Sequence, residues 1–300
     1  MTALLVQSNL TSGNVSGNTT QKLDGHTNKN RMVLLSIDTV VLLSGVLCMV
    51  VTVRVLQFTT RSLTAIAVLN LIFTHFLFLV TLPFRIHYYV VGKWTLGDGW
   101  CKVTSSMIHI HLYMSFICYV VILVTRLLAF HKRANQVEFH RRTHALLCSL
   151  AIWVVVMVVV PCIVHFCYGN REEQQDTSKC FEFGHQIKDG HAKAFNYAIS
   201  AVIIAVSVLL TGLQAHVLLQ LYREYGHGCY SQQVFGAQVK SLCFALIMMV
   251  CFVPYHMFRM YYITNLKLQP TNEVFLSLTT LNCLDMLTFL GKGTWVKCYK

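Results

Sequence analysis

Seven long apolar runs are the feature that most restricts what this chain can fold into. They cover residues 33–57, 63–90, 101–130, 144–166, 192–222, 236–264 and 272–291. Each is at least as long as the roughly 20 residues that a helix needs to cross a bilayer, and none shows the alternation of a barrel strand. Because backbone groups in lipid must pair within their own segment, the runs predict an all-α fold, a bundle of seven transmembrane helices.

The composition agrees with one membrane domain. The 300 residues are 55% hydrophobic and 12% charged, whereas a soluble domain carries about 25% charged residues. We assign residues 32–291 to the bundle, residues 1–31 to an extracellular tail and residues 292–300 to a short cytoplasmic tail. The net charge is +12, but its basic residues are spread along loop edges. This pattern excludes a nucleic-acid partner and leaves membrane lipid as the surroundings.

Three glycosylation sequons indicate which end of the chain lies outside the cell. Their asparagines, Asn9, Asn14 and Asn18, all fall within the first 20 positions. A basic inner loop at residues 131–142 supports the same orientation more weakly. The first residues lack the basic start and apolar stretch of a cleavable signal peptide. We therefore expect a multi-pass protein of the plasma membrane with an extracellular N-terminus.

Cys101 and Arg126 lie near the two ends of the third run, and Cys180 lies further along the chain. Of 12 cysteines, most lie inside or near apolar runs, whereas Cys101 lies at the polar start of the third run and Cys180 in the polar loop after the fourth. A disulfide between them would hold the second outer loop against the third helix; the alternative is two unpaired thiols. Arg126 follows Cys101 by 25 positions, roughly 37 Å of helix, and so lies at the opposite membrane face. Taken alone, Arg126 could simply snorkel there.

Several motifs occur in an order that resembles the rhodopsin-like G-protein-coupled receptors, and in particular their purinergic-like branch. They are Leu69-Asn70-Leu71, Cys101, Arg126, Trp153, Cys251-Phe252-Val253-Pro254, Leu281-Asn282-Cys283-Leu284-Asp285, Leu82-Pro83-Phe84-Arg85, His111-Leu112-Tyr113-Met114-Ser115 and Pro254-Tyr255-His256. The resemblance implies an extracellular ligand, a heterotrimeric G protein as partner and no cofactor. It also implies that Arg126 meets the G protein when the sixth helix swings outward at the Pro254 kink, with Phe252, Asp285 and Phe289 in the same switch.

Basic residues near the outer helix ends suggest an anionic ligand. A charge within a span is costly and usually faces a cavity, and arginine binds phosphate or carboxylate with two hydrogen bonds. The candidate ligand-binding residues are Arg85, Lys93, Tyr113, His256 and Arg259. The alternative is that the arginines snorkel to the lipid headgroups.

Five departures from the family pattern concern the switch. They are His75 in place of a sodium-binding aspartate, Thr125 in place of the acid before the arginine, Met286 in place of a proline, Phe289 in place of a tyrosine, and no proline in residues 192–222. Losing the acid at Thr125 should raise basal activity, whereas losing the hydroxyl at Phe289 should weaken coupling. Cys298 is a candidate for palmitoylation.

The family's sodium site maps onto His75, His111, Ser115 and Asp285, where we expect a polar core with a hydrogen bond between His75 and Asp285. This pair either satisfies itself structurally or senses protons. No metal site is predicted, because His109 and His111 are two positions apart and point away from each other on a helix. The histidines therefore give no support to an enzyme.

Other membrane functions fit the sequence less well. There is no internal repeat, pair of broken helices or ring of acids to indicate a transporter or channel, and residues 272–291 contain no lysine for a retinal pump. The remaining alternative is a receptor-like protein that does not signal alone and acts as a dimer partner.

Overall fold

The computed structural model describes residues 29–54, 63–131, 147, 149–160, 162, 180–181, 190–225 and 233–289. The long helices are Lys29–Arg54, α2 (Leu63–Val91), α3 (Asp98–His131), α5 (Gly190–Tyr225) and α6 (Gln233–Thr264); shorter ones are Ser149–Val160, η3 (Leu266–Leu268), α7 (Gln269–Thr279) and η4 (Thr280–Phe289). Every predicted run therefore contains a helix. The sequons, the basic inner loop and Cys298 lie outside the described residues.

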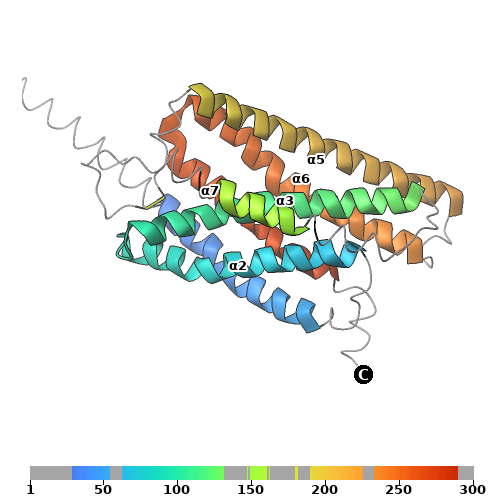
Figure 1. Ribbon diagram of the computed structural model, residues 1–300, viewed down its shortest axis with the longest axis horizontal. Coiled ribbons are helices and arrows are strands. Elements are labelled where there is room, and N and C mark those ends of the chain that lie inside the picture. The colour runs from blue at the N-terminus through green and yellow to red at the C-terminus, as the bar shows by residue number, and fades with distance from the viewer. Residues whose placement is uncertain are drawn as a thin grey trace, which may run out of the picture.

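The helices run alongside one another with α3 in the middle (Figure 1). Helix α3 contacts α2, α5 and α6, while α6 also contacts α5 and α7. Five of the described helices, all longer than 25 residues, are apolar enough to cross a membrane. The all-α, seven-run architecture predicted from the sequence is confirmed.

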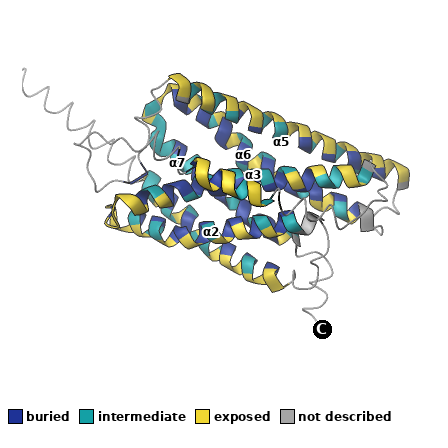
Figure 2. Cartoon of the chain, in the orientation of Figure 1, coloured by how far each residue is buried: buried dark blue, intermediate teal, exposed yellow. Residues whose placement is uncertain are grey.

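Polarity is inverted relative to a water-soluble bundle. Large apolar side chains are exposed on the outside, with Leu47 69% and Val250 72% accessible, and exposed residues line the outward faces of the helices (Figure 2). Polar side chains such as His75, His111 and Asp285 are fully buried. This distribution suits a bundle whose outer surface faces lipid and whose polar groups satisfy one another inside.

The first helix begins earlier than the apolar run predicts. Its described part reaches back to Lys29, within the segment assigned to the tail, and Arg31 ties it to α2. Arg31 Nε donates to the Tyr89 carbonyl at 2.7 Å and Arg31 Nη2 to the Val90 carbonyl at 3.1 Å. These are carbonyls of the last turn of α2, which lack partners within the helix. Hydrophobicity alone does not reveal such a charged anchor.

The seventh run forms two kinds of helix in succession. α7 has 11 residues with a proline in its first turn, and it continues into the 10-residue 3₁₀-helix η4. A 3₁₀-helix rises about 2.0 Å per residue against 1.5 Å for an α-helix, so this segment reaches roughly 36 Å, enough for a bilayer core. Such a long 3₁₀ stretch is unusual, and it carries Asp285.

The short helix Ser149–Val160 packs against α2. Trp153 Nε1 donates to Asn70 Oδ1 at 3.2 Å, and the Trp153 ring meets the edge of Phe73 with 5.1 Å between ring centroids. The two residues that marked these helices in the sequence, Asn70 and Trp153, are therefore direct partners.

Candidate functional site

A disulfide joins Cys101 at the start of α3 to Cys180, as the sequence predicted. The turn between α2 and α3 presents Cys101. Gly92 and Gly97 both adopt positive φ, 77° and 83°, a conformation that glycine takes without steric cost. The Gly92 amide donates to the Tyr88 carbonyl at 2.8 Å and closes α2.

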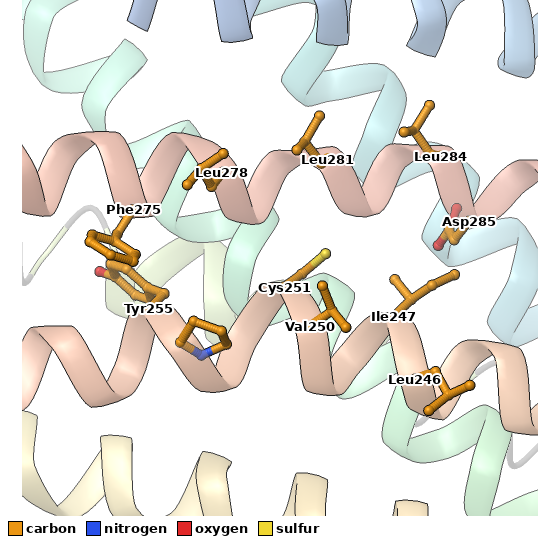
Figure 3. A pocket seen from close by; sticks show the side chains of 11 residues that line it. Leu246, Ile247, Val250, Cys251, Tyr255, Phe275, Leu278, Leu281, Leu284 and Asp285 are labelled. Carbon is orange, nitrogen blue, oxygen red and sulfur yellow. The ribbon is translucent and has the colours of Figure 1, made fainter. Parts of the chain in front are cut away.

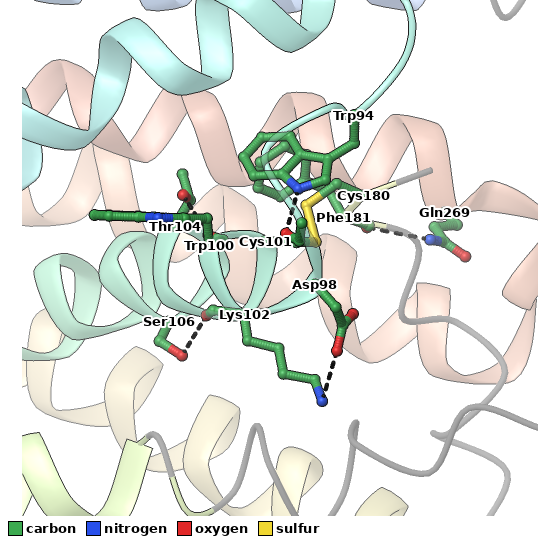
Figure 4. The surroundings of a disulfide bond; sticks show 11 residues. Trp94, Asp98, Trp100, Cys101, Lys102, Thr104, Ser106, Cys180, Phe181 and Gln269 are labelled. Carbon is green, nitrogen blue, oxygen red and sulfur yellow. Dashed lines mark hydrogen bonds and ion pairs between the residues drawn. A yellow bond between two sulfur atoms is a disulfide. The ribbon is translucent and has the colours of Figure 1, made fainter. Parts of the chain in front are cut away.

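Aromatic rings cover the disulfide (Figure 4). Trp94 Nε1 donates to the Gly97 carbonyl at 2.6 Å, and Trp94, Cys101, Cys180 and Phe181 form one buried cluster. The Phe181 carbonyl accepts from Gln269 Nε2 at 3.4 Å. The short segment after the disulfide is thus tied to both α3 and α7 at one end of the bundle.

Arg85 lies beneath this disulfide and is not a snorkelling side chain, because it is only 3% exposed. Its Nε donates to Asp38 Oδ2 at 3.1 Å and forms a buried ion pair. Its Nη2 reaches Ser277 Oγ at 3.2 Å, and its guanidinium carbon lies 4.9 Å from the Phe181 ring centroid. Arg85 therefore links the first helix, α2 and α7.

Arg259 and His256 lie one helical turn apart on α6, as their spacing predicted, and both are buried. Arg259 Nε and Nη2 donate to Asn196 Oδ1 at 3.0 and 2.7 Å, and Nη1 donates to Tyr255 Oη at 2.9 Å. His256 Nδ1 is 3.2 Å from Ser200 Oγ. Both residues are thereby held against α5.

The two remaining candidate ligand residues, Tyr113 and Lys93, differ in their surroundings. Tyr113 is half-buried on α3, one turn below His109, which lies within electrostatic reach of both Arg85 and Arg259. Arg85 on α2 and Arg259 on α6 therefore both lie near this part of α3. Lys93 is exposed in the turn after α2, and no contact joins it to the other candidates in the described part of the chain.

A second polar cluster lies deeper, between α2, α3 and η4. His75 Nε2 is 3.2 Å from Asp285 Oδ1, which is the hydrogen bond expected from the sequence. His75 Nδ1 is 2.9 Å from His111 Nε2. Tyr119 Oη donates to Asp285 Oδ2 at 2.5 Å, and Cys283 Sγ lies 3.4 Å from His75 Nδ1.

Other atoms around this cluster are buried without a hydrogen bond to any described residue. They include Ser115 Oγ and His111 Nδ1. Asn282, next to Cys283 in η4, is also buried, and neither atom of its amide has a partner in the described segments. The structure places all four predicted polar-core residues in the interior, but it joins only three of them by hydrogen bonds.

The opposite end of α3 carries Arg126, which is half-buried. Its guanidinium forms no hydrogen bond or ion pair with the described residues, consistent with threonine at position 125. Here α3 packs on α5 and α6: Gln214 Nε2 donates to the Leu123 carbonyl at 3.2 Å. A buried cluster of Val217, Leu221 and Phe235 packs against Leu127 and Phe130.

Helix α6 contains Pro254, and a cavity of about 580 Å³ lies between part of α6 and the seventh helix. Its lining is apolar apart from Asp285 and Tyr255, and side chains of α6 face those of α7 and η4 across it (Figure 3). Phe252, one turn before Tyr255, is fully buried against Phe116 and Tyr119. The structure describes the backbone of Phe289 but not its side chain.

Several residues of these sites were not predicted. Asp38 had a signal, since it is the only acid in the first apolar run. Cys283 stood within a quoted motif but was not singled out, and Tyr119 and Asn196 had no signal of their own, because they acquire their roles from partners on other helices. In the sequence, the signal considered for a metal site was the spacing of histidines along one helix. In the structure, the contacts of the buried histidines join different helices.

Comparisons with known proteins agree with this architecture. Residues 46–289 match the 7 transmembrane receptor (rhodopsin family). The chain is 38% identical to human probable G-protein coupled receptor 141 over 274 residues, 88% of this chain and 90% of that protein. It is 30% identical to chicken lysophosphatidic acid receptor 6, over 46% of each chain. It is 24% identical to rat 2-oxoglutarate receptor 1, over 65% of this chain and 57% of that protein.

The match covers most of the chain and spans all of the described helices from α2 onward. Together with the apolar exterior it shows a multi-pass membrane protein, and neither the family nor the relatives are enzymes. The chain belongs to the rhodopsin family of seven-transmembrane, G-protein-coupled receptors.

Proposed function

We propose that this receptor binds an anionic extracellular ligand between α2, α3 and α6 and signals to heterotrimeric G proteins. The observation that carries the ligand class is the pair of buried guanidinium groups, Arg85 and Arg259, which both lie near one part of α3. Burying a cation within a span is costly, and such residues usually serve a substrate or ligand. Tyr113 and His256 supply further hydrogen-bonding groups beside them.

The names of two relatives support this ligand class. Lysophosphatidic acid and 2-oxoglutarate, after which they are named, are both anions. One presents a phosphate and the other two carboxylates, the groups that arginine recognises with two parallel hydrogen bonds.

A ligand assay with two anionic probes tests the site. Cells expressing the receptor would be exposed to 2-oxoglutarate and to a lysophosphatidic acid, with G-protein activation as the readout. We expect Arg259→Gln to raise the concentration for half-maximal response at least tenfold. Lys102→Gln, which removes a partly exposed cation near the same end of α3, should leave it unchanged. Equal responses in wild type and Arg259→Gln would contradict the assignment.

The orientation belongs to the same proposal. The disulfide end of α3 should face the oxidising exterior, where such bonds persist, and the three sequons place the N-terminus on that side. Location in the plasma membrane is part of the same proposal. Arg126, at the other end of α3, is then the residue that meets the G protein when α6 swings at Pro254.

Constitutive signalling distinguishes this function from that of a silent dimer partner. The receptor expressed alone should give G-protein activation above background, and Arg126→Ala should abolish it at equal surface expression. The exposed Arg223→Ala near the end of α5 is a matched control, since it removes an arginine without touching α3. No output from the receptor expressed alone, with or without the anionic probes, would favour the dimer partner.

A further inference from the structure

We propose that His75, His111 and Cys283 form a binding site for a zinc ion inside the helix bundle. The three residues come from α2, α3 and η4, are all buried, and offer ligand atoms that lie within 4.8 Å of one another. Nitrogen and sulfur are the donors that zinc prefers, whereas sodium, magnesium and calcium take oxygen ligands. The sodium site that this region resembles in other receptors therefore has the wrong donors here.

The distances between the three ligand atoms fit tetrahedral coordination. His75 Nδ1 and His111 Nε2 are 2.9 Å apart, and Cys283 Sγ lies 3.4 and 3.6 Å from them. Zinc bonds of ordinary length at a tetrahedral angle separate two nitrogens by about 3.3 Å, and a nitrogen and a sulfur by about 3.6 Å. Shifts of a few tenths of an ångström thus suffice to bind the ion. Its fourth position is left for a small ligand such as water.

Asp285 completes the site by holding the His75 ring, without itself binding the metal. With Nδ1 on the metal, His75 Nε2 carries its proton and donates it to Asp285, 3.2 Å away. A carboxylate behind a ligating histidine is the usual arrangement in zinc sites, where it fixes the ring orientation and raises the basicity of the ligand. Tyr119 Oη donates to the second oxygen of the same carboxylate and so orients it.

The charges balance within the cluster. Zinc binding displaces the Cys283 thiol proton, which leaves for solvent. The proton of the hydrogen bond between His111 Nε2 and His75 Nδ1 moves to His111 Nδ1, so that both ligating nitrogens are free to bind the metal. Zn²⁺ then meets one thiolate and, through His75, one carboxylate. The sum of +2, −1 and −1 is zero. An uncompensated charge at this depth would be very costly, whereas a neutral set of metal and ligands is not.

The 3₁₀ geometry of η4 explains how one helix supplies both the thiol and the carboxylate. Residues two apart point roughly 120° from each other in a 3₁₀-helix but about 160° from each other in an α-helix. Cys283 and Asp285 can therefore approach the two nitrogens of one ring, Nδ1 and Nε2 of His75, from adjacent sides. A regular α-helix would turn one of them away.

Cobalt spectroscopy on the full-length receptor tests the site. The protein would be purified in detergent with a tag free of histidine, analysed for zinc and copper by elemental mass spectrometry, then stripped and titrated with Co²⁺. We expect one zinc per receptor. Cobalt should give a near-ultraviolet thiolate charge-transfer band and the intense visible bands of a tetrahedral site.

Variants assign the ligands. Cys283→Ser should remove the charge-transfer band, and His111→Ala should abolish stoichiometric binding. Asp285→Asn should keep the band and weaken affinity about 10- to 100-fold. Cys118→Ser removes a buried thiol of α3 that is not one of the three ligands. It should change neither the charge-transfer band nor the affinity. Intact Cys101–Cys180 disulfide and a monodisperse elution profile confirm folding of each variant.

Two results would overturn the proposal. One is a wild-type receptor that retains no metal and gives no charge-transfer band at saturating cobalt, a result that needs no variant. The other is a band that survives in Cys283→Ser. Because the readout is metal content and absorption, it stands apart from the ligand and signalling proposals.

Discussion

The residue with the largest expected effect on stability is Asp38. Its carboxylate accepts from Arg85 inside the bundle, and neither side chain is more than 3% exposed. The carboxylate also fixes the position in which Arg85 stands beneath the disulfide. A buried ion pair adds little net stability as a pair, but losing one partner leaves a buried charge uncompensated.

We therefore predict that Asp38→Asn lowers the free energy of unfolding by about 3–5 kcal/mol. Thermal unfolding of the purified receptor, followed by tryptophan fluorescence, measures it. Lys102→Ala is the control, because it breaks a partly exposed pair with Asp98 one turn away, worth at most about 0.5 kcal/mol. The double change Asp38→Asn with Arg85→Met should recover most of the loss. Equal melting temperatures for Asp38→Asn and Lys102→Ala would show that the pair is not structural.

A second prediction for a single residue concerns Tyr119, in the deeper polar cluster. Tyr119→Phe removes only the hydroxyl that donates to Asp285 Oδ2, and it leaves that buried oxygen without this donor. We expect a loss of about 1–3 kcal/mol in unfolding free energy. The control is Tyr261→Phe, on an exposed position of α6, which should be neutral. A loss that appears in both variants to the same degree would mean that the hydroxyl at position 119 has no special partner.

At the scale of elements, the sequence predicted where helices lie but not how they meet. A membrane span is predictable because lipid demands a long apolar segment with internal hydrogen bonds. The change from α7 to 3₁₀ in η4 leaves no such trace, since both geometries satisfy the backbone. Cys283 was visible within a recognised motif, yet its proximity to His75 and His111 depends on the rotation and register of three helices.

Both sites were predicted only in part. Arg85, His256 and Arg259 stood out because a charge or imidazole in an apolar run is rare. Their partners did not: Asn196 and Ser277 are ordinary polar residues in the sequence and gain importance only from the neighbouring helix. Lys93 shows the limit of this reasoning, since its charge lies at a helix end where exposure is expected.

The contact between the first helix and α2 gives a prediction for a pair of elements. A Cβ added at Gly45 would lie 2.8 Å from Leu79 Cδ2, whereas one added at Gly212 on α5 would meet nothing within 4 Å. Gly45→Leu should therefore force the two helices apart and destabilise the receptor by about 1–3 kcal/mol. Gly212→Leu should be neutral. Thermal unfolding of the two variants, measured in parallel, compares their stabilities. Equal stability would mean that the contact between the two helices accommodates the larger side chain.

At the scale of the whole molecule, the cavity between α6 and the seventh helix contrasts with the packed end near Arg126. Leucine and phenylalanine side chains from α3, α5 and α6 close that end. Pro254, which cannot supply a backbone hydrogen bond to its helix, lies between the packed end and the outer site. A helix that is tightly packed at one end and has a cavity along one side can adopt two conformations. A ligand can shift the population between them.

This arrangement predicts that loosening the packed end raises basal signalling. Phe235 lies in the first turn of α6 and is buried against α3 and α5, so Phe235→Ala removes contacts that exist only while α6 is closed. If at least about 1.4 kcal/mol of that loss falls on the closed state, the open population rises about tenfold. Constitutive G-protein activation at matched surface expression is the measurement.

Val239→Ala, one turn further along α6 at an exposed position, is the matched control and should leave basal output unchanged. The double variant Phe235→Ala with Arg126→Ala should be silent, because an open receptor still needs the arginine to engage the G protein. If Phe235→Ala lowers stability without raising output, the packed end is only structural, and the swing of α6 does not begin there. A rise that persists without Arg126 would instead separate the opening of α6 from the role assigned to that arginine.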